Sequence, residues 1–308
     1  MSPVLRGPIL WTTERSFVRR LITEHPIGRR IAERFVAGDS LEAGMAAARD
    51  LDAAGIRAML DHLGENVSSP AQAAAAADGY VAALKRIRES PEFGSNISVK
   101  LTQLGLDLGA ATCQENMERV LQVAGEAEPI LVMIDMEARE YVDRTLQVYL
   151  ALRERYPNVG VCLQAYLFRT AEDVRRIAGR RAIVRMAKGA YLEPKDVAYQ
   201  RMPDIRRNYA RLAATLLSAG STVHFATHDP RLVHGAARYV TRRGVPRERF
   251  EFQLLNGVRR DIQAELVAQG QPVRVYIPYG TQWYPYLTRR LAERPANVYF
   301  FLSNAVRR

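Results

Sequence analysis

Cysteine is almost absent from this chain of 308 residues, which contains only Cys113 and Cys162. The two cysteines form no CxxC pair and are too few for a disulfide framework, which excludes a disulfide-stabilised secreted domain and a cysteine-rich zinc site. Long apolar runs are missing too: no uncharged stretch reaches the ~18 residues of a spanning helix, and the N-terminus lacks the apolar segment of a secretory signal. We therefore expect a cytoplasmic protein in a reducing compartment.

Lysine is scarce as well, although the chain is basic. Of the 44 basic residues only Lys85, Lys100, Lys188 and Lys195 are lysines, and the formal net charge is +11. The arginines are spread along the chain and do not gather in one basic run, which argues against nucleic acid as the partner. An acidic lipid surface and a general preference for arginine both remain as explanations of the charge.

The order of apolar and charged segments indicates an α/β protein with a helical beginning. Residues 12–90 show helical periodicity and no visible strand, with amphipathic stretches over 41–54 and 70–89. From residue 95, short apolar runs alternate with charged stretches of helical periodicity, which is typical of a parallel sheet covered by helices. The runs are 97–101, 130–136, 159–164, 182–187, 222–226, 250–254, 273–277 and 297–302.

Eight such units predict a (β/α)8 barrel of the TIM type over residues 95–308, with a helical region over 1–94 packed against it. A doubly wound open sheet is the alternative, but no GxGxxG follows the first run. One feature is irregular. Few residues follow the eighth run, so a normal eighth helix does not fit there, whereas a helix-like segment over 283–293 precedes that run.

Polar residues at the ends of the predicted strands are the candidate site, because barrel enzymes carry their sites there. Lys100 and Asp135 each lie in an apolar run, so we expect them to face one another or a ligand, or to form a structural ion pair. Asp135 and Glu137 are two residues apart, a spacing that would suit a cation or acid/base chemistry. No HExxH or CxxC supports a metal, and His224 is expected to be a satisfied core histidine.

The segment from Arg185 to Tyr191 combines two cations with a turn of small residues at a predicted strand end. Backbone amides in such a turn can approach a phosphate closely, and Thr227 and His228 on the next strand add donors. The segment therefore predicts a pyrophosphate cradle, with a plain tight turn as the alternative. The adjacent Arg289 and Arg290 could clamp a carboxylate, but Arg-Arg pairs are common here, and by itself the sequence favours surface charge.

Taken together, these segments resemble the proline dehydrogenase family, in its short single-function bacterial form. The resemblance covers residues 95–304 in the family's order. It rests on ISVKLT (97–102), IDME (134–137), CLQAY (162–166), VRMAKGAY (184–191), ATH (226–228), QLLNG (253–257), VYIPYG (275–280) and YLTRRLAE (286–293). The family's fold is a distorted (β/α)8 barrel whose last helix lies across the mouth, which would explain segment 283–293 and would make Arg289 and Arg290 functional.

The resemblance implies FAD, bound without a covalent link, as the cofactor of L-proline oxidation. It implies catalytic roles for Asp135 and Arg185. It implies substrate binding by Lys100, Leu255, Tyr276, Tyr286, Arg289 and Arg290. It implies cofactor binding by Met136, Gln164, Arg185, Ala187, Lys188, Gly189, Ala190, Tyr191, Thr227, His228 and Glu293. The sequence departs from the family's phosphate motif at Met186, Ala187 and Leu192, which puts the detailed cofactor packing in question.

The resemblance also implies partners. The product would be 1-pyrroline-5-carboxylate, a membrane quinone would reoxidise the FAD, and a separate 1-pyrroline-5-carboxylate dehydrogenase would act next. Because the quinone lies in the bilayer, loose peripheral association with an anionic membrane is expected. Two other classes stay open on the residues alone: a barrel lyase that forms a Schiff base through Lys100 or Lys188, and a basic protein that binds nucleic acid.

Overall fold

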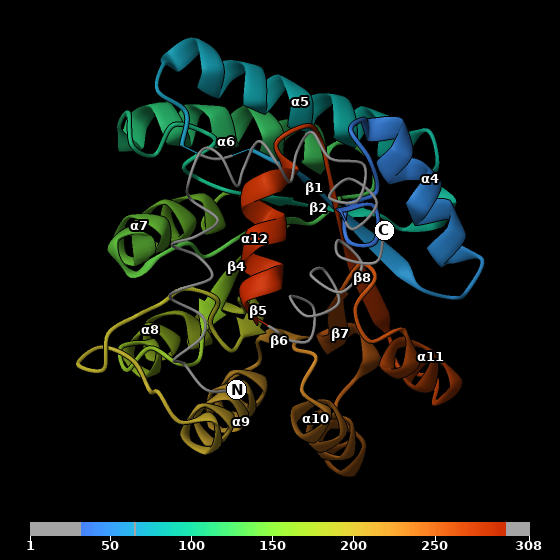
Figure 1. Cartoon of the computed structure of the whole chain (residues 1–308). Coiled ribbons are helices and arrows are strands. Elements are labelled where there is room, and N and C mark those ends of the chain that lie inside the picture. Colours follow the sequence, from blue (N-terminus) through green and yellow to red (C-terminus); the bar gives the residue numbers. More distant parts are fainter. Residues whose placement is uncertain (1–31, 65, 294–308) are drawn as a thin grey trace, which may run out of the picture.

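Eight parallel strands close into a barrel in the computed structural model of the chain, which describes residues 32–64 and 66–293 (Figure 1). Each strand pairs with the next along the chain, and β8 pairs with β1. The strands are β1 (Arg57–His62), β2 (Asn96–Val99), β3 (Val132–Ile134), β4 (Val159–Gln164), β5 (Ile183–Ala187), β6 (Thr222–Ala226), β7 (Phe250–Leu255) and β8 (Val273–Tyr279). The closed order confirms the predicted (β/α)8 barrel and excludes the doubly wound sheet.

Among the described residues, one α-helix precedes β1, and each strand is then followed by another. The helices are α4 (Leu41–Asp52), α5 (Pro70–Arg88), α6 (Ala110–Gly125), α7 (Val142–Arg153), α8 (Thr170–Ile177), α9 (Met202–Ser218), α10 (Pro230–Arg243), α11 (Arg260–Ala268) and α12 (Trp283–Glu293). Helices α4 to α11 surround the barrel, and α12 lies in front of its opening. Local chemistry sets several of their ends. The Ser69 hydroxyl accepts a hydrogen bond from the Gln72 amide at 3.3 Å, Pro70 follows it at the first turn, and α10 ends at Gly244 with φ 58°.

The first strand of the barrel lies inside the region for which only helices were predicted. That prediction is wrong at β1 (Arg57–His62), so the barrel begins before residue 95. The segment reads RAMLDH and contains no β-branched residue, so its local preference gives no strand signal. Its strand conformation comes from backbone pairing with β2 and β8 on either side.

The other strand predictions match the structure closely, with one exception that cannot be compared. The runs predicted at 159–164 and 222–226 coincide with β4 and β6, and the other internal runs differ by a few residues at their ends. The run predicted at 297–302 lies outside the described residues. Since β1 already completes the barrel, the irregular helix position has a simple reason: α12 follows the eighth strand of the barrel, β8.

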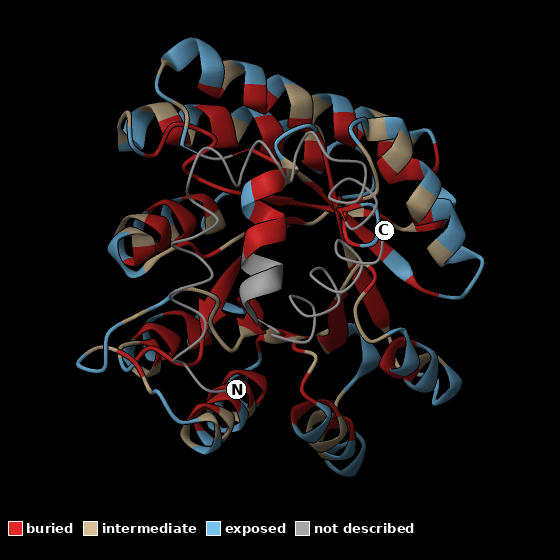
Figure 2. Ribbon diagram, viewed as in Figure 1, coloured by how far each residue is buried: buried red, intermediate tan, exposed pale blue. Residues whose placement is uncertain are grey.

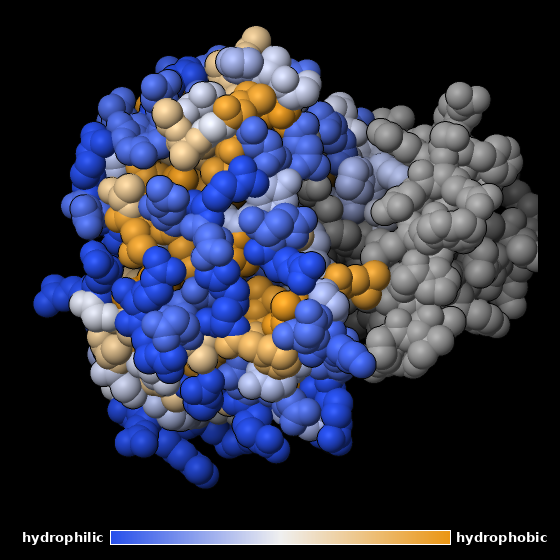
Figure 3. All heavy atoms as spheres, turned by 90° about the vertical axis from the view of Figure 1, so that its left-hand side faces the viewer, coloured by the Kyte–Doolittle hydropathy of each residue, from blue (hydrophilic) through white to orange (hydrophobic). Residues whose placement is uncertain are grey.

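Burial explains why the strands read as continuous apolar runs. Every residue of β4 is buried, because one face of the strand meets the barrel interior and the other meets the helices (Figure 2). The view of the side that carries α6 to α8 shows mainly hydrophilic side chains with apolar groups between them (Figure 3). Within residues 32–64 and 66–293, no helix combines the length and apolar character needed to cross a bilayer.

Helix α12 lies in front of the barrel opening in Figure 1, where it covers the ends of the strands. Its residues Tyr284, Tyr286 and Leu287 pack with Phe35 and Val36, which precede α4, in a small apolar cluster separate from the main core. The structure therefore places a helix across the mouth, as the resemblance implied.

Candidate functional site

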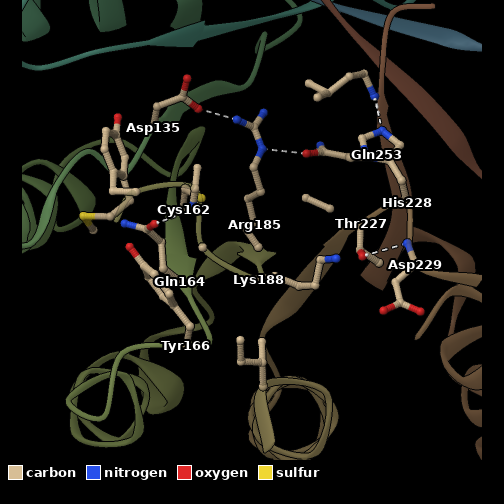
Figure 4. Close-up of a pocket in the computed structure, with 18 of the residues that line it drawn as sticks. Asp135, Cys162, Gln164, Tyr166, Arg185, Lys188, Thr227, His228, Asp229 and Gln253 are labelled. Atoms are coloured by element: carbon tan, nitrogen blue, oxygen red, sulfur yellow. Dashed lines mark hydrogen bonds and ion pairs between the residues drawn. The ribbon is translucent and has the colours of Figure 1, made fainter. Parts of the chain in front are cut away.

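A cavity of about 610 Å³ opens at the carboxyl ends of the strands (Figure 4). Every predicted site residue whose side chain the structure describes lines this cavity. These residues are Lys100, Asp135, Met136, Gln164, Arg185, Ala187, Lys188, Gly189, Ala190, Tyr191, Thr227, His228, Leu255, Tyr276 and Tyr286. Lys100 and Tyr286, which are 186 positions apart in the sequence, thus line the same cavity. Its volume is in the range that is usual for cofactor sites.

Lys100 lies at the centre of an ion cluster on one side of the cavity. Its Nζ is 3.0 Å from Asp61 Oδ1 and 3.4 Å from Asp135 Oδ2. The Tyr276 hydroxyl donates to the same Asp135 oxygen at 2.8 Å. The expected approach of Lys100 and Asp135 is present, and Asp61 on β1 is the closer partner of the two carboxylates.

The carboxylates fix the charge of Lys100. Burial by itself lowers the pKa of Lys100, but Asp61 and Asp135 outweigh burial and raise that pKa well above its usual value. Burial likewise raises the pKa of Asp135, but Lys100 and Arg185 reverse the effect and lower it. A lysine that stays protonated is a poor nucleophile, which argues against a Schiff base at Lys100.

Arg185, on β5, is held from several directions. Its guanidinium forms an ion pair with Asp135, donates to the Ser98 hydroxyl at 3.0 Å, and donates from Nε to Gln253 Oε1 at 2.6 Å (Figure 4). Its guanidinium carbon lies 5.3 Å from the centre of the Tyr276 ring. The side chain is 7% exposed, so its orientation is set before any ligand arrives.

A second buried group of charged and polar side chains lies inside the barrel next to Arg185. Arg274 Nε lies 2.9 and 3.1 Å from the two oxygens of Glu251, and Gln253 Nε2 lies 2.9 Å from His224 Nδ1. Burial raises the pKa of Glu251, but Arg274 and His224 outweigh it and lower that pKa to about 2. Burial lowers the pKa of His224 to about 4, so this histidine is neutral and satisfied, as predicted.

The backbone of the turn after β5 packs closely against the Tyr166 ring at Gly189. Gly189 has φ 129°, and a Cβ at this position would lie 2.2 Å from the Tyr166 ring, so only glycine fits. The Ala190 amide donates to Gln164 Oε1 at 3.2 Å, and Gln164 Nε2 donates to the Glu137 carbonyl at 2.7 Å. Gln164 therefore ties this turn to the end of β3.

The departures from the family motif differ in their position. The Met186 side chain is fully buried outside the cavity lining, and Ala187 lines the cavity. Leu192 also borders the cavity and is 50% exposed. The change at Met186 therefore alters packing behind the strand, and the changes at Ala187 and Leu192 alter the lining itself.

Thr227 and His228 follow β6 on the opposite side of the cavity from Gln164 (Figure 4). The Thr227 hydroxyl accepts from the Asp229 amide at 3.2 Å, and His228 Nε2 accepts from the Leu255 amide at 2.9 Å. This bond uses His228 Nε2 as an acceptor, so Nδ1 is the ring nitrogen left to act as a donor. Asp229 also receives a hydrogen bond from Arg206 Nε at 2.7 Å, which adds a cation at the edge of the cavity.

Asp135 and Glu137 act differently despite their spacing. Both follow the end of β3, and Asp135 joins the ion cluster, whereas Glu137 accepts from the amide of Thr102 at 3.2 Å and from its hydroxyl at 2.7 Å. Across the described ranges, no three His, Cys, Asp or Glu side chains are grouped to hold a metal ion.

Arg289, Arg290 and Glu293 lie in α12, but their side chains fall outside the described part of the chain. The roles expected of these three residues therefore stay predictions.

Asp61 and Gln253 are among the polar residues of the site that were missed in the sequence. Asp61 is fully buried against Lys100, and Gln253 contacts Arg185. Asp61 carried the same signal as Lys100, an ionisable residue inside an apolar run, but the run was not recognised as a strand. Gln253 lies within the predicted run 250–254, where an amide gives no charge signal.

Residues 45–302 match the proline dehydrogenase family. The chain is 36% identical to proline dehydrogenase of Deinococcus radiodurans over 100% of its own length and 99% of that protein, and 35% identical to proline dehydrogenase 1 of Bacillus subtilis over 90% and 91%. In structure it is similar to proline utilization A from Bdellovibrio bacteriovorus, with a TM-score of 0.81 and 22% identity. The chain covers 36% of that longer protein, so this likeness concerns the fold.

We predict that His224 makes folding sensitive to acid. The pKa of His224 is 6.5 in the unfolded chain and about 4 in the folded protein, so the unfolded chain takes up the proton first as the pH falls. The free energy of unfolding is therefore highest above pH 6.5 and decreases as the pH falls to about 4. The loss amounts to about 3 kcal/mol. Urea unfolding between pH 7 and 4 should show a smaller loss for His224→Asn.

The control is His234→Asn, since the His234 side chain on α10 is 40% exposed. This variant should follow the unaltered protein at each pH. Parallel curves for His224→Asn and the unaltered protein would contradict the prediction.

Proposed function

Because this chain belongs to the proline dehydrogenase family, we propose that it oxidises L-proline to 1-pyrroline-5-carboxylate with non-covalently bound FAD. A membrane quinone then takes the electrons from the FAD, and a separate dehydrogenase consumes the product. The observation that supports this proposal most strongly is the single cavity that joins the Lys100, Asp135 and Arg185 cluster to the turn at Gly189. One end is suited to a small anionic substrate, and the other is suited to a phosphate-bearing cofactor.

The residues present fit FAD by their donor chemistry. Lys188 and Arg206 supply cations beside the turn at Gly189, whose backbone no other residue type could adopt. Thr227 and His228 border the same space from β6. Such a set of cations, backbone amides and hydroxyls is what a pyrophosphate requires. We assign the remaining predicted cofactor contacts, Met136, Gln164, Ala187, Ala190, Tyr191 and Glu293, to the same ligand.

The protein's part in the reaction is binding and orientation. FAD, when bound, supplies the acceptor for the hydride that leaves C5 of proline. Arg289, Arg290 and Lys100 bind the carboxylate, and Leu255, Tyr276 and Tyr286 form the wall around the apolar ring. The ring nitrogen enters as the free base, its lone pair forms the C=N bond as the C5–H bond breaks, and the N–H proton is released to solvent.

Asp135 and Arg185 organise the charges at the reacting end. Asp135 pairs with Lys100 and accepts from Tyr276, which keeps both groups aimed at the substrate side of the cavity. Arg185 provides a buried positive charge that stabilises the negative charge gained by the cofactor. Both side chains are already held by their partners, so little reorganisation is needed during the reaction.

The proposal predicts a yellow protein whose colour is bleached by its substrate. Purified protein should show the absorbance of oxidised flavin, and L-proline should remove that band in the absence of oxygen, because hydride transfer reduces the FAD. NADH should be a poor reductant, since the chain has no nicotinamide fingerprint. A folded, colourless protein that takes up no added FAD would end this proposal.

Arginine variants should separate substrate binding from cofactor chemistry. Arg289→Met or Arg290→Met should weaken proline binding by tenfold to hundredfold, the equivalent of ~1.5 to 3 kcal/mol for a charge-assisted contact, with the flavin spectrum unchanged. Arg185→Met should instead slow flavin reduction or loosen FAD. Spectral titrations with proline and with FAD measure both effects.

The matched control for these variants is Arg238→Met, because Arg238 is exposed on the outer side of α10. It should change neither proline nor FAD affinity. Normal proline affinity in both Arg289→Met and Arg290→Met would show that the carboxylate clamp is wrong.

The charge distribution supports peripheral binding to an anionic bilayer, where the quinone lies. Residues 169–260 contain 20 basic and 8 acidic residues, whereas residues 32–168 contain 12 basic and 20 acidic residues. In Figure 1 these segments form opposite sides of the barrel, with α8 to α10 on the basic side and α4 to α6 on the acidic side. An even preference for arginine would not divide the charge in this way.

We therefore expect the α9–α10 side of the protein to bind to anionic vesicles at low salt. Replacing Arg211, Arg238 and Arg242 by Gln should weaken sedimentation with the vesicles, because each well-placed basic residue contributes up to ~1 kcal/mol. The control replaces Arg49, Arg119 and Arg155 by Gln, which removes the same charge from the acidic segment. No binding by the unaltered protein, or equal loss in both variants, would refute the docking side.

A further inference from the structure

Gln253 connects the two buried charge groups of the barrel. Its Oε1 accepts from Arg185 Nε at 2.6 Å, and its Nε2 lies 2.6 Å from Glu251 Oε1 and 2.9 Å from His224 Nδ1. Figure 4 shows its amide directed at the Arg185 guanidinium from β7, across the cavity from Asp135. Gln253 is 5% exposed, and it also lines the cavity.

These partners permit one orientation of the amide. A guanidinium can only donate, so the oxygen must face Arg185, and the Glu251 carboxylate can only accept, so the nitrogen must face Glu251. Turning the amide over would place donors against donors at Arg185 and acceptors against acceptors at Glu251. The Gln253 side chain is therefore locked by charged groups on both sides.

Glu251, the partner of the Gln253 nitrogen, is itself held in place by Arg274. Arg274 binds both oxygens of Glu251, and its NH1 donates to the carbonyls of Ala58 at 2.7 Å and Gly94 at 2.8 Å. Ala58 belongs to β1, and Gly94 lies just before β2. Through Glu251 and Arg274, Gln253 is thus connected to the backbone at the amino-terminal ends of β1 and β2, opposite the cavity.

We propose that Gln253 is a positioning residue for the reaction, which holds Arg185 in its working orientation while leaving the Arg185 charge unneutralised on that side. The inference rests on the proposed function, because it assigns to Arg185 the stabilisation of the reduced cofactor. The Nε contact fixes the guanidinium plane, and Asp135 and Ser98 then fix its other edge.

The amide is the appropriate group at this position because it accepts a hydrogen bond without a charge. The buried groups balance as they stand: Lys100, Arg185 and Arg274 are opposed by Asp61, Asp135 and Glu251. A carboxylate at position 253 would neutralise Arg185 and would repel Glu251 at the present nitrogen position. A leucine would fill the space but would leave Arg185 Nε without its acceptor.

The test compares Gln253→Leu and Gln253→Glu with Gln103→Leu. Gln103 is a buried glutamine that accepts from Tyr80 at 2.7 Å, so its loss removes one buried hydrogen bond without touching Arg185. Anaerobic stopped-flow at saturating proline gives the flavin reduction rate, spectral titration gives the proline dissociation constant, and dye equilibration gives the reduction potential of the bound FAD.

We expect both Gln253 variants to reduce FAD at least about tenfold more slowly, with proline affinity changed less than about twofold and the reduction potential shifted to a more negative value. Gln103→Leu should leave the rate and the potential unchanged. In an Arg185→Met background, Gln253→Leu should cause little further loss, because its effect passes through Arg185. Gln253→Glu keeps the acceptor and the side-chain length, and it carries the test if Gln253→Leu does not fold.

Three results would overturn the inference: rates and potentials equal to those of the unaltered protein, an equal loss in Gln103→Leu, or a full additional loss in the Arg185→Met background. The proposed function is tested separately in the unaltered protein. If proline leaves its FAD oxidised, both proposals are wrong. If proline reduces it and the Gln253 variants behave normally, only the positioning role is wrong.

Discussion

Charges buried inside the barrel are tolerated because each of them is paired with a charge from another strand. Lys100 meets Asp61 and Asp135, Arg185 meets Asp135, and Arg274 meets Glu251. Removing one partner from a buried pair leaves an uncompensated charge and typically costs about 3–5 kcal/mol. These pairs join strands that are neighbours or next neighbours in the barrel, whereas the hydrogen bond from Arg185 on β5 to Ser98 on β2 reaches across its interior.

The same pairs prepare the site for chemistry. Lys100, Asp135 and Arg185 are held by protein partners, so their charges are fixed at the cavity wall before substrate binds. In the proposed reaction, this arrangement supplies electrostatic stabilisation without moving groups. The proposed activity therefore depends on the same network that pairs the buried charges of the barrel, in which most side chains have two or more partners.

Helix α12, which covers the cavity, is held by apolar contacts, in contrast to the paired charges inside the barrel. Helix α12 packs through Tyr284 and Leu287 on Phe35 and Val36, and these contacts are apolar. They join the beginning of the described chain to its end over the barrel mouth. Tyr286 on the same helix lines the cavity, so the apolar packing that holds α12 in place also completes the wall.

The sequence by itself determined the barrel class and most strand positions, because buried parallel strands are continuous apolar runs, and an ionisable residue inside such a run stands out. The resemblance of its motifs indicated about half of the residues that line the cavity. It did not reveal β1, since RAMLDH has no strand preference of its own and becomes a strand only between β2 and β8. Asp61 was lost with it. Tertiary structure alone decided which carboxylate binds Lys100, and it alone brought Gln253 to Arg185, because these contacts join residues 39 and 68 positions apart and form only when separate strands assemble into one sheet.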